Sequence, residues 1–166
     1  MAIALKKEYS LKLADEVFLV VATLHQENLE RDDFSVQEIM DKANDLRLNG
    51  TVRAGFVTHV RMHCVANMAP NPGDYRILFA AGKSRRRLLK KPDQTNRQRN
   101  GKMFPDLRDL DPKYFALVTW ARERYEASGE NENKFSELLG LAGSGKEVWA
   151  DEHADEYIDR LRSDWD

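Results

Sequence analysis

The sequence predicts an α+β fold that is mainly α-helical and carries a small β-hairpin. Two observations predict this class. Apolar residues recur at helical spacing in several segments, and a segment near the middle of the chain alternates apolar and polar residues as a strand does. The length of 166 residues fits one ordinary domain with an appendage, or two very small domains.

The N-terminal third predicts two helices separated by a short strand. A first helix is expected from about Leu11 to Asn28, because its apolar positions follow the three-and-four spacing of a helix with one buried face. Phe34 is expected to begin a short strand. The run Ser35 to Glu38 has the pattern of a capping box, which opens a second helix from Val36 to about Leu46.

A third helix and a β-hairpin are expected next. The pair Asn49-Gly50 indicates a turn, and Thr51 can then cap a helix that runs to roughly Asn67, where Pro70 and Pro72 exclude its continuation. Strands are predicted at Tyr75–Phe79 and Arg85–Leu89, joined by a turn at Gly82. Two short helices joined by a tight turn and followed by a hairpin are typical of a winged helix-turn-helix.

The remaining segments divide the chain into three parts. A polar connection is expected at 90–109, and Asp111-Pro112 is a good start for a fourth helix. We expect residues 1–127 to form the winged-helix domain with flanking helices. Residues 128–142 would form a linker with a short helix, and residues 143–166 an acidic amphipathic tail, so extra C-terminal helices follow the domain.

Charge is segregated along the chain although the net charge is only −2. Residues 83–102 contain nine Lys or Arg and one acid, Asp93, a net charge of +8, so the rest of the chain carries −10. The last twenty residues contain eight acids against two arginines. Such segregation predicts two surfaces with different partners, the basic one suited to the phosphates of double-stranded DNA.

The DNA-contacting residues are predicted to lie on the third helix and on the hairpin. The first turns of the second helix of a helix-turn-helix enter the major groove, and cations beside a hairpin turn can reach the backbone. The helix supplies Thr51, Arg53, Thr58 and Arg61 as candidates, and the hairpin supplies Lys83, Arg85, Arg86 and Arg87. The alternative is that both sets are ordinary solvated surface.

Enzymatic and metal-dependent functions find little support in the sequence. His59, His63 and Cys64 resemble part of a zinc site, but a structural zinc normally needs four ligands, and Cys64 is expected in the core. Residues 140–147 approach a phosphate-binding loop, yet Glu147 stands where Ser or Thr would meet magnesium. We therefore expect no catalytic residues, no cofactor and no metal. One cysteine, no secretory signal and no membrane-spanning run predict a cytoplasmic protein.

The tail carries large apolar anchors at helical spacing on an otherwise charged segment. Aromatic anchors on an amphipathic helix suit a groove on another protein. These anchors are Trp149, Tyr157, Ile158, Leu161 and Trp165. The alternative is a final helix that packs on its own domain.

Two resemblances add to these expectations. Residues 34–125 resemble an uncharacterised bacterial and archaeal winged-helix domain family through the motifs at 51–60, 63–67, 75–78 and 82–88. That resemblance implies the fold and a presumed DNA-binding role. The tail, from Gly143 to about residue 165, resembles the C-terminal segment of small antitoxins that partner PIN-domain ribonuclease toxins. This second resemblance implies that the tail blocks a toxin, with Arg160 or Arg162 entering its acidic cleft.

The sequence thus predicts a DNA-binding transcriptional regulator or antitoxin-like repressor whose tail binds a protein. One alternative is a winged-helix module that binds proteins and not DNA. The other is an accessory subunit of a nuclease system.

Overall fold

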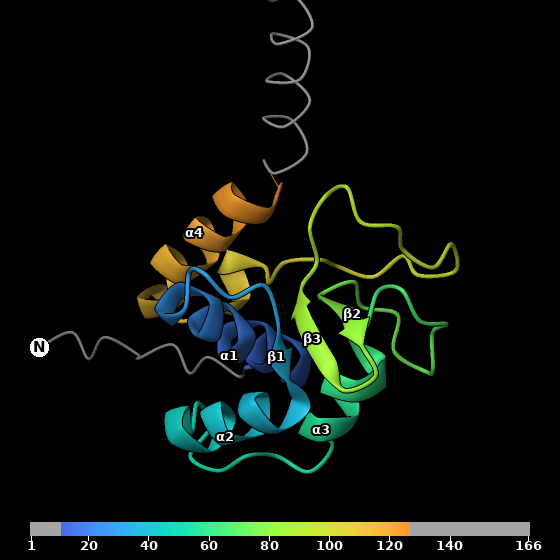
Figure 1. The fold of residues 1–166 in the computed structure, drawn as a ribbon. Helices are drawn as coiled ribbons and strands as arrows, with labels where there is room; N and C mark the ends of the chain where they lie inside the picture. Colours follow the sequence, from blue (N-terminus) through green and yellow to red (C-terminus); the bar gives the residue numbers. More distant parts are fainter. Residues whose placement is uncertain (1–10, 127–166) are drawn as a thin grey trace, which may run out of the picture. The chain divides into compact units, whose positions relative to one another are not determined.

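The computed structural model describes residues 11–126, so the expected linker at 128–142 and tail at 143–166 lie outside the described residues. The predicted class, mainly α with a small antiparallel sheet, is confirmed (Figure 1). The elements are, in order, α1 (Leu13–Glu27), β1 (Phe34–Ser35), α2 (Val36–Leu46), α3 (Phe56–Thr58), the π-helical turn η1 (His59–His63), β2 (Leu78–Gly82), β3 (Arg85–Leu88), the 3₁₀ turns η2 (Leu107–Asp109) and η3 (Pro112–Tyr114), and α4 (Phe115–Glu126).

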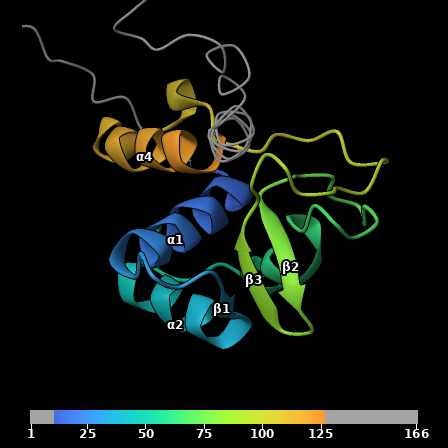
Figure 2. The same ribbon diagram turned by 45° about the horizontal axis from the view of Figure 1, so that its top comes forward.

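Helix α1 is the centre of the domain and lies between α2, α4 and the sheet (Figures 1 and 2). Its bounds agree with the prediction to within two residues. The expected single buried face is wrong, because the helix is buried around most of its surface, including Asp15 and Glu16 in its first turn. Within residues 11–126, no helix has both the length and the apolar character needed to cross a bilayer.

The capping box that opens α2 is confirmed. The Ser35 hydroxyl accepts from the Glu38 amide at 3.1 Å, and the Glu38 carboxylate accepts from the Ser35 amide at 2.8 Å. The helix ends at Arg47, which adopts a left-handed conformation with φ of 43°. These contacts fix both ends of α2 locally, which is why the sequence predicts them well.

The predicted hairpin is present, and β1 adds a third strand to give the order β1-β3-β2. All pairs are antiparallel, with Phe34 opposite Arg86 and Leu78 opposite Leu88. The first hairpin strand begins at Leu78 and not at Tyr75, because the Arg76 and Ile77 amides bond to other segments, at the carbonyls of Lys102 and Cys64.

The prediction of a helix from Thr51 to Asn67 is wrong at both ends. Gly50 and Gly55 have φ of 82° and 89°, so the chain between them is not helical, and Gly55, not Thr51, is the N-cap. The helix ends at Cys64, whose carbonyl accepts the Ile77 and Leu78 amides. Phe56 is fully buried in this short segment.

The helical start expected at Asp111-Pro112 is present as the 3₁₀ turn η3, and α4 continues from it at Phe115. The Asp111 side chain accepts from the Lys113 amide at 3.1 Å, and Pro112 occupies the first turn. Val118, Ala121 and Tyr125 form its buried stripe against α1.

Candidate nucleic-acid interface

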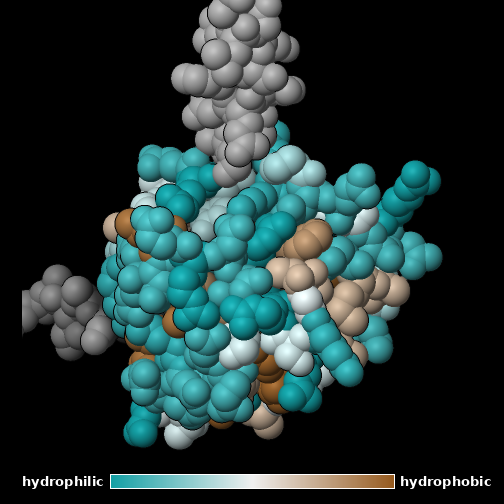
Figure 3. Space-filling view, in the orientation of Figure 1, coloured by the Kyte–Doolittle hydropathy of each residue, from teal (hydrophilic) through white to brown (hydrophobic). Residues whose placement is uncertain are grey.

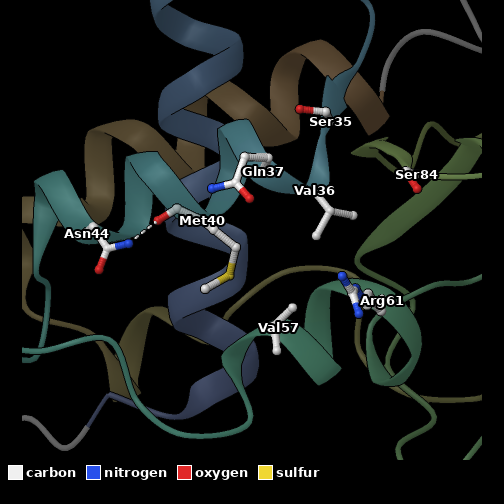
Figure 4. Close-up of a pocket in the computed structure, with 8 residues that line it drawn as sticks. All are labelled: Ser35, Val36, Gln37, Met40, Asn44, Val57, Arg61 and Ser84. Atoms are coloured by element: carbon white, nitrogen blue, oxygen red, sulfur yellow. Dashed lines mark hydrogen bonds between the residues drawn. The ribbon is translucent and has the colours of Figure 1, made fainter.

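A groove of 480 Å³ lies between α2, the α3–η1 segment and the turn of the β2–β3 hairpin (Figure 4). Its lining joins three parts of the chain that are distant in sequence. The lining residues are Ser35, Val36, Gln37, Met40 and Asn44 from the α2 side, Val57 and Arg61 from the α3–η1 segment, and Ser84 from the hairpin turn.

The groove has an apolar floor and a polar rim. Val36, Met40 and Val57 supply the apolar side chains, and the space-filling view shows hydrophobic surface between α2 and α3 (Figure 3). Gln37 and Arg61 are exposed at the rim. A surface of this kind can accept a ligand that combines polar or charged groups with apolar ones.

Arg61 and Lys83 are the cations most available at this face. Both are exposed, and neither side chain has a hydrogen bond or ion pair with any residue of the described part of the chain. Arg61 lies on η1, while Lys83 directly precedes Ser84 in the hairpin turn. The α3–η1 segment and the hairpin turn, both of which contribute lining residues to the groove, therefore each carry an exposed cation. Thr58 is partly exposed on the same segment.

The expectation that Arg85 and Arg87 project freely from the hairpin is wrong. Arg85 is ion-paired with Asp33, and Arg87 binds Asp93 through two nitrogens at 2.6 and 2.7 Å. The Arg87 guanidinium also stacks on the Phe79 ring, with the side chain only 13% exposed. Carboxylates already neutralise both cations, so they contribute less to a phosphate-binding field than their number suggests.

Arg86 is also misassigned by the sequence pattern, because it points into the protein. The residue is 5% exposed, and its guanidinium donates to the carbonyls of Val60 and Arg61 at 3.1 Å each. It donates in addition to the Gly82 and Arg85 carbonyls at 3.2 and 2.8 Å. Burial, and to a smaller extent the neighbouring Arg61 charge, lowers the pKa of Arg86, but an arginine remains protonated in proteins.

Arg99 performs a related role that the sequence analysis missed. It is 2% exposed and donates to the carbonyls of Met62 and His63 at 2.8 Å each, and to three further carbonyls, those of Met68, Ala69 and Tyr75. The last carbonyls of a helix have no intrahelical partner and carry partial negative charge. Together Arg86 and Arg99 satisfy the four consecutive carbonyls of residues 60–63 at the end of η1.

Arg53 and Thr51 do not lie on a helix, contrary to prediction. The Arg53 guanidinium binds the buried carboxylate of Glu16 at 2.6 and 2.8 Å, and Asn49 donates to the same oxygen at 3.0 Å. The ion pair ties the segment before α3 to α1. Arg53 therefore serves the fold, while Thr51 is exposed in the connecting segment.

The sequence analysis did not identify the α2 side of the groove. Gln37, Met40 and Asn44 are three and four residues apart, so they occupy one face of the helix. This spacing is visible in the sequence. The spacing alone did not predict a groove, because the opposite wall comes from residues 57, 61 and 84, which are distant in sequence.

The residues weighed for metal binding or nucleophilic chemistry do not form such a site in residues 11–126. Cys64 is fully buried, and burial raises the pKa of its thiol to about 12, so no thiolate forms near neutral pH. The rings of His59 and His63 pack edge to face at 4.8 Å. No group of three or more His, Cys, Asp or Glu in this range is placed to hold a metal ion.

Comparison of the chain with protein-family models, with curated proteins and with solved structures gives no match.

Proposed function

We propose that residues 11–126 form a winged helix-turn-helix that binds double-stranded DNA, and that the protein is a transcriptional regulator or antitoxin-like repressor of the cytoplasm. The α3–η1 segment would be the recognition helix and the β2–β3 turn the wing. The role requires no cofactor, no metal and no catalytic residue.

The order of the elements supports this fold assignment. A short strand, β1, separates α1 from α2, and the hairpin follows α3 and pairs with that strand through β3. This arrangement places the turn of the hairpin on the same side of the domain as α3 (Figure 1). A duplex that meets the helix can therefore also meet the wing.

The observation that carries the proposal is a pair of exposed cations, Arg61 and Lys83, whose side chains have no partner among residues 11–126 and which lie on two segments that line one groove. Arg61 lines the groove from η1, and Lys83 directly precedes Ser84, the lining residue of the hairpin turn. Phosphate contacts from such cations supply affinity and position the protein, while neighbouring polar side chains read the bases. Thr58 is the polar candidate on the helix.

The tail is proposed to capture a protein partner of the PIN-domain toxin class, on the basis of the resemblance given above. Its contact residues, Trp149, Tyr157, Ile158, Arg160, Leu161 and Trp165, lie outside the described residues. Deleting residues 143–166 should abolish capture of such a toxin and leave DNA binding intact. Capture of the same toxin by the truncated chain would exclude this role of the tail.

The DNA-binding proposal is tested by fluorescence anisotropy with a random-sequence duplex at several salt concentrations. We expect binding that weakens steeply with salt. Lys83→Met and Arg61→Met should each lower the slope of log K against log salt by about 0.9, the value for one lost phosphate contact. An unchanged slope in both variants would refute the proposed interface.

Arg97→Met is the matched control, since it removes an exposed cation from the same basic run but, unlike Lys83, does not adjoin a residue that lines the groove. It should change the slope much less than Lys83→Met. Equal effects of the two variants would mean that net charge, and not the geometry of the groove, determines binding.

The apolar floor of the groove favours a second function, a winged-helix module that binds a protein. Met40 and Val57 would then contact a side chain of that partner. Absence of a gel shift with duplex at low salt, together with a wild-type fold, would favour this alternative.

A further inference from the structure

We infer that Arg86 is a positioning residue that sets the spacing between the proposed recognition helix and the proposed wing. The inference rests on the proposed function for its effect on DNA. Its structural part, the coupling of two segments by one guanidinium, stands on the hydrogen bonds alone.

The four hydrogen bonds of Arg86 divide into two pairs. Nε and one terminal nitrogen donate to the carbonyls of Val60 and Arg61, in η1. The other terminal nitrogen donates to the carbonyls of Gly82 and Arg85, which flank the two-residue hairpin turn. A planar guanidinium has donors in fixed directions. The hydrogen bonds to η1 therefore restrain the position of the hairpin turn, and those to the residues flanking the turn restrain η1.

The hydrogen bonds of Arg86 connect the two segments that carry the exposed cations Arg61 and Lys83. The Arg61 carbonyl accepts from Arg86, while the Arg61 side chain lines the groove. Lys83 follows Gly82, another acceptor of the same guanidinium. The spacing between the backbone at Arg61 and the hairpin turn that carries Lys83 is therefore restrained through Arg86, and contacts to one duplex depend on such prearranged spacing.

The burial of Arg86 distinguishes its positioning role from a role in phosphate binding. At 5% exposure, and with donors on all three nitrogens directed at carbonyls, Arg86 has little surface to offer a phosphate. Its cation is instead satisfied by partial negative charge at a helix C-terminus and a turn. Arginine commonly contacts DNA phosphates, but Arg86 is directed at backbone carbonyls, so we do not include it among the DNA-contacting residues.

Arg86→Lys is the informative variant, because lysine keeps the charge but has a single ammonium that cannot reach both pairs of carbonyls. We expect about a tenfold loss of duplex affinity, which corresponds to about 1.4 kcal/mol, with an unchanged salt slope. Lys83→Met is the control for a true phosphate contact, with a slope lower by about 0.9. A reduced slope in Arg86→Lys, or wild-type affinity in a folded variant, would overturn the inference.

One measurement remains valid if the variant folds poorly, and a second remains valid if the protein does not bind DNA. In the wild-type protein, the Arg86 Nε–H resonance should be protected from solvent exchange and should keep its position when duplex is added. A large shift on adding duplex would indicate phosphate contact and overturn the assignment.

Amide hydrogen exchange in the absence of DNA tests the coupling itself. The Cys64 amide, bonded to the His59 carbonyl, reports on η1, and the Val36 amide, bonded to the Ser84 carbonyl, reports on the turn. Arg86→Lys should accelerate both relative to the amides of α1. Acceleration on one side alone would refute the coupling, whereas absence of duplex binding by wild-type protein would refute only the proposed function.

Discussion

His25 is a buried imidazole whose titration should make the stability of the domain depend on pH. The residue is 3% exposed and lies on α1 between the rings of Phe34 and Tyr125, at 4.9 and 5.5 Å. Its Nε2 is placed to accept the Leu88 amide at 3.3 Å, which requires the unprotonated form at that nitrogen. Burial, the main cause, lowers its pKa from 6.5 to about 4.

Acid should destabilise the folded protein, because the pKa of His25 is lower in the folded protein than in the unfolded chain. Between pH 6.5 and about 4 the unfolded chain binds a proton that the folded protein does not, so stability is complete above pH 6.5 and decreases as the pH falls through this range. At about 1.4 kcal/mol for each tenfold change in the proton equilibrium, the full loss is about 3 kcal/mol. Roughly 2 kcal/mol of it should be lost by pH 5.

The assay is urea denaturation of wild-type protein and of His25→Gln at pH 7.5 and pH 5, followed by circular dichroism. Glutamine does not titrate, and its side-chain oxygen can accept a hydrogen bond. We expect wild-type protein to lose about 2 kcal/mol more than the variant between the two pH values. Carboxylates with lowered pKa values, such as that of Glu38 at about 2, affect stability mainly below this window.

His59→Gln is the matched control. Burial also lowers the pKa of His59, but this imidazole is only partly buried, so its variant should retain most of the pH dependence. If His25→Gln loses as much stability between pH 7.5 and pH 5 as wild-type protein does, the proposed origin of the effect is wrong.

Three further predictions concern the fold around the groove. Glu16→Ala should lower the free energy of unfolding by about 3 kcal/mol in urea titrations, because it leaves the Arg53 guanidinium and Asn49 without their buried acceptor; a loss below about 0.5 kcal/mol, typical of a surface site, would contradict this. Ser35→Ala should cost about 1 kcal/mol by removing the cap of α2, whereas Ser84→Ala, at a side chain without a hydrogen bond to any residue of 11–126, should cost less than half of that; equal losses would exclude the cap as the cause. The Cys64 thiol should react with Ellman's reagent only at the rate of unfolding, since it is buried with a pKa of about 12; rapid labelling of native protein would disprove its burial.

The sequence predicted features that depend on neighbouring residues. The capping box at Ser35, the capped turn η3 that starts at Asp111 and leads into α4, and the strand at Phe34 are all encoded within a few positions. The start of α3 was not predicted, because Gly55 could have continued a helix at modest cost. Glycine adopts the left-handed conformation observed there, with φ of 89°, about as readily as a helical one, so the residue type alone does not decide between them.

The roles of the basic residues were harder to predict because their partners are remote in sequence. Arg85 is 52 residues from Asp33, and Arg53 is 37 residues from Glu16. A local charge count treats all such cations as surface. The structure separates Lys83 and Arg61, which remain available, from Arg86 and Arg99, whose donors bind backbone carbonyls.

The inward-facing arginines also impose an order on folding. Arg86 and Arg99 follow their acceptors Val60 and Met62 by 26 and 37 positions. A helix as short as the α3–η1 segment does not persist alone in water, and closing loops of this length costs entropy before any contact compensates for it. The segment should therefore acquire its final geometry late. A nascent chain on the ribosome would have no finished groove until residue 99 has been synthesised and has left the exit tunnel.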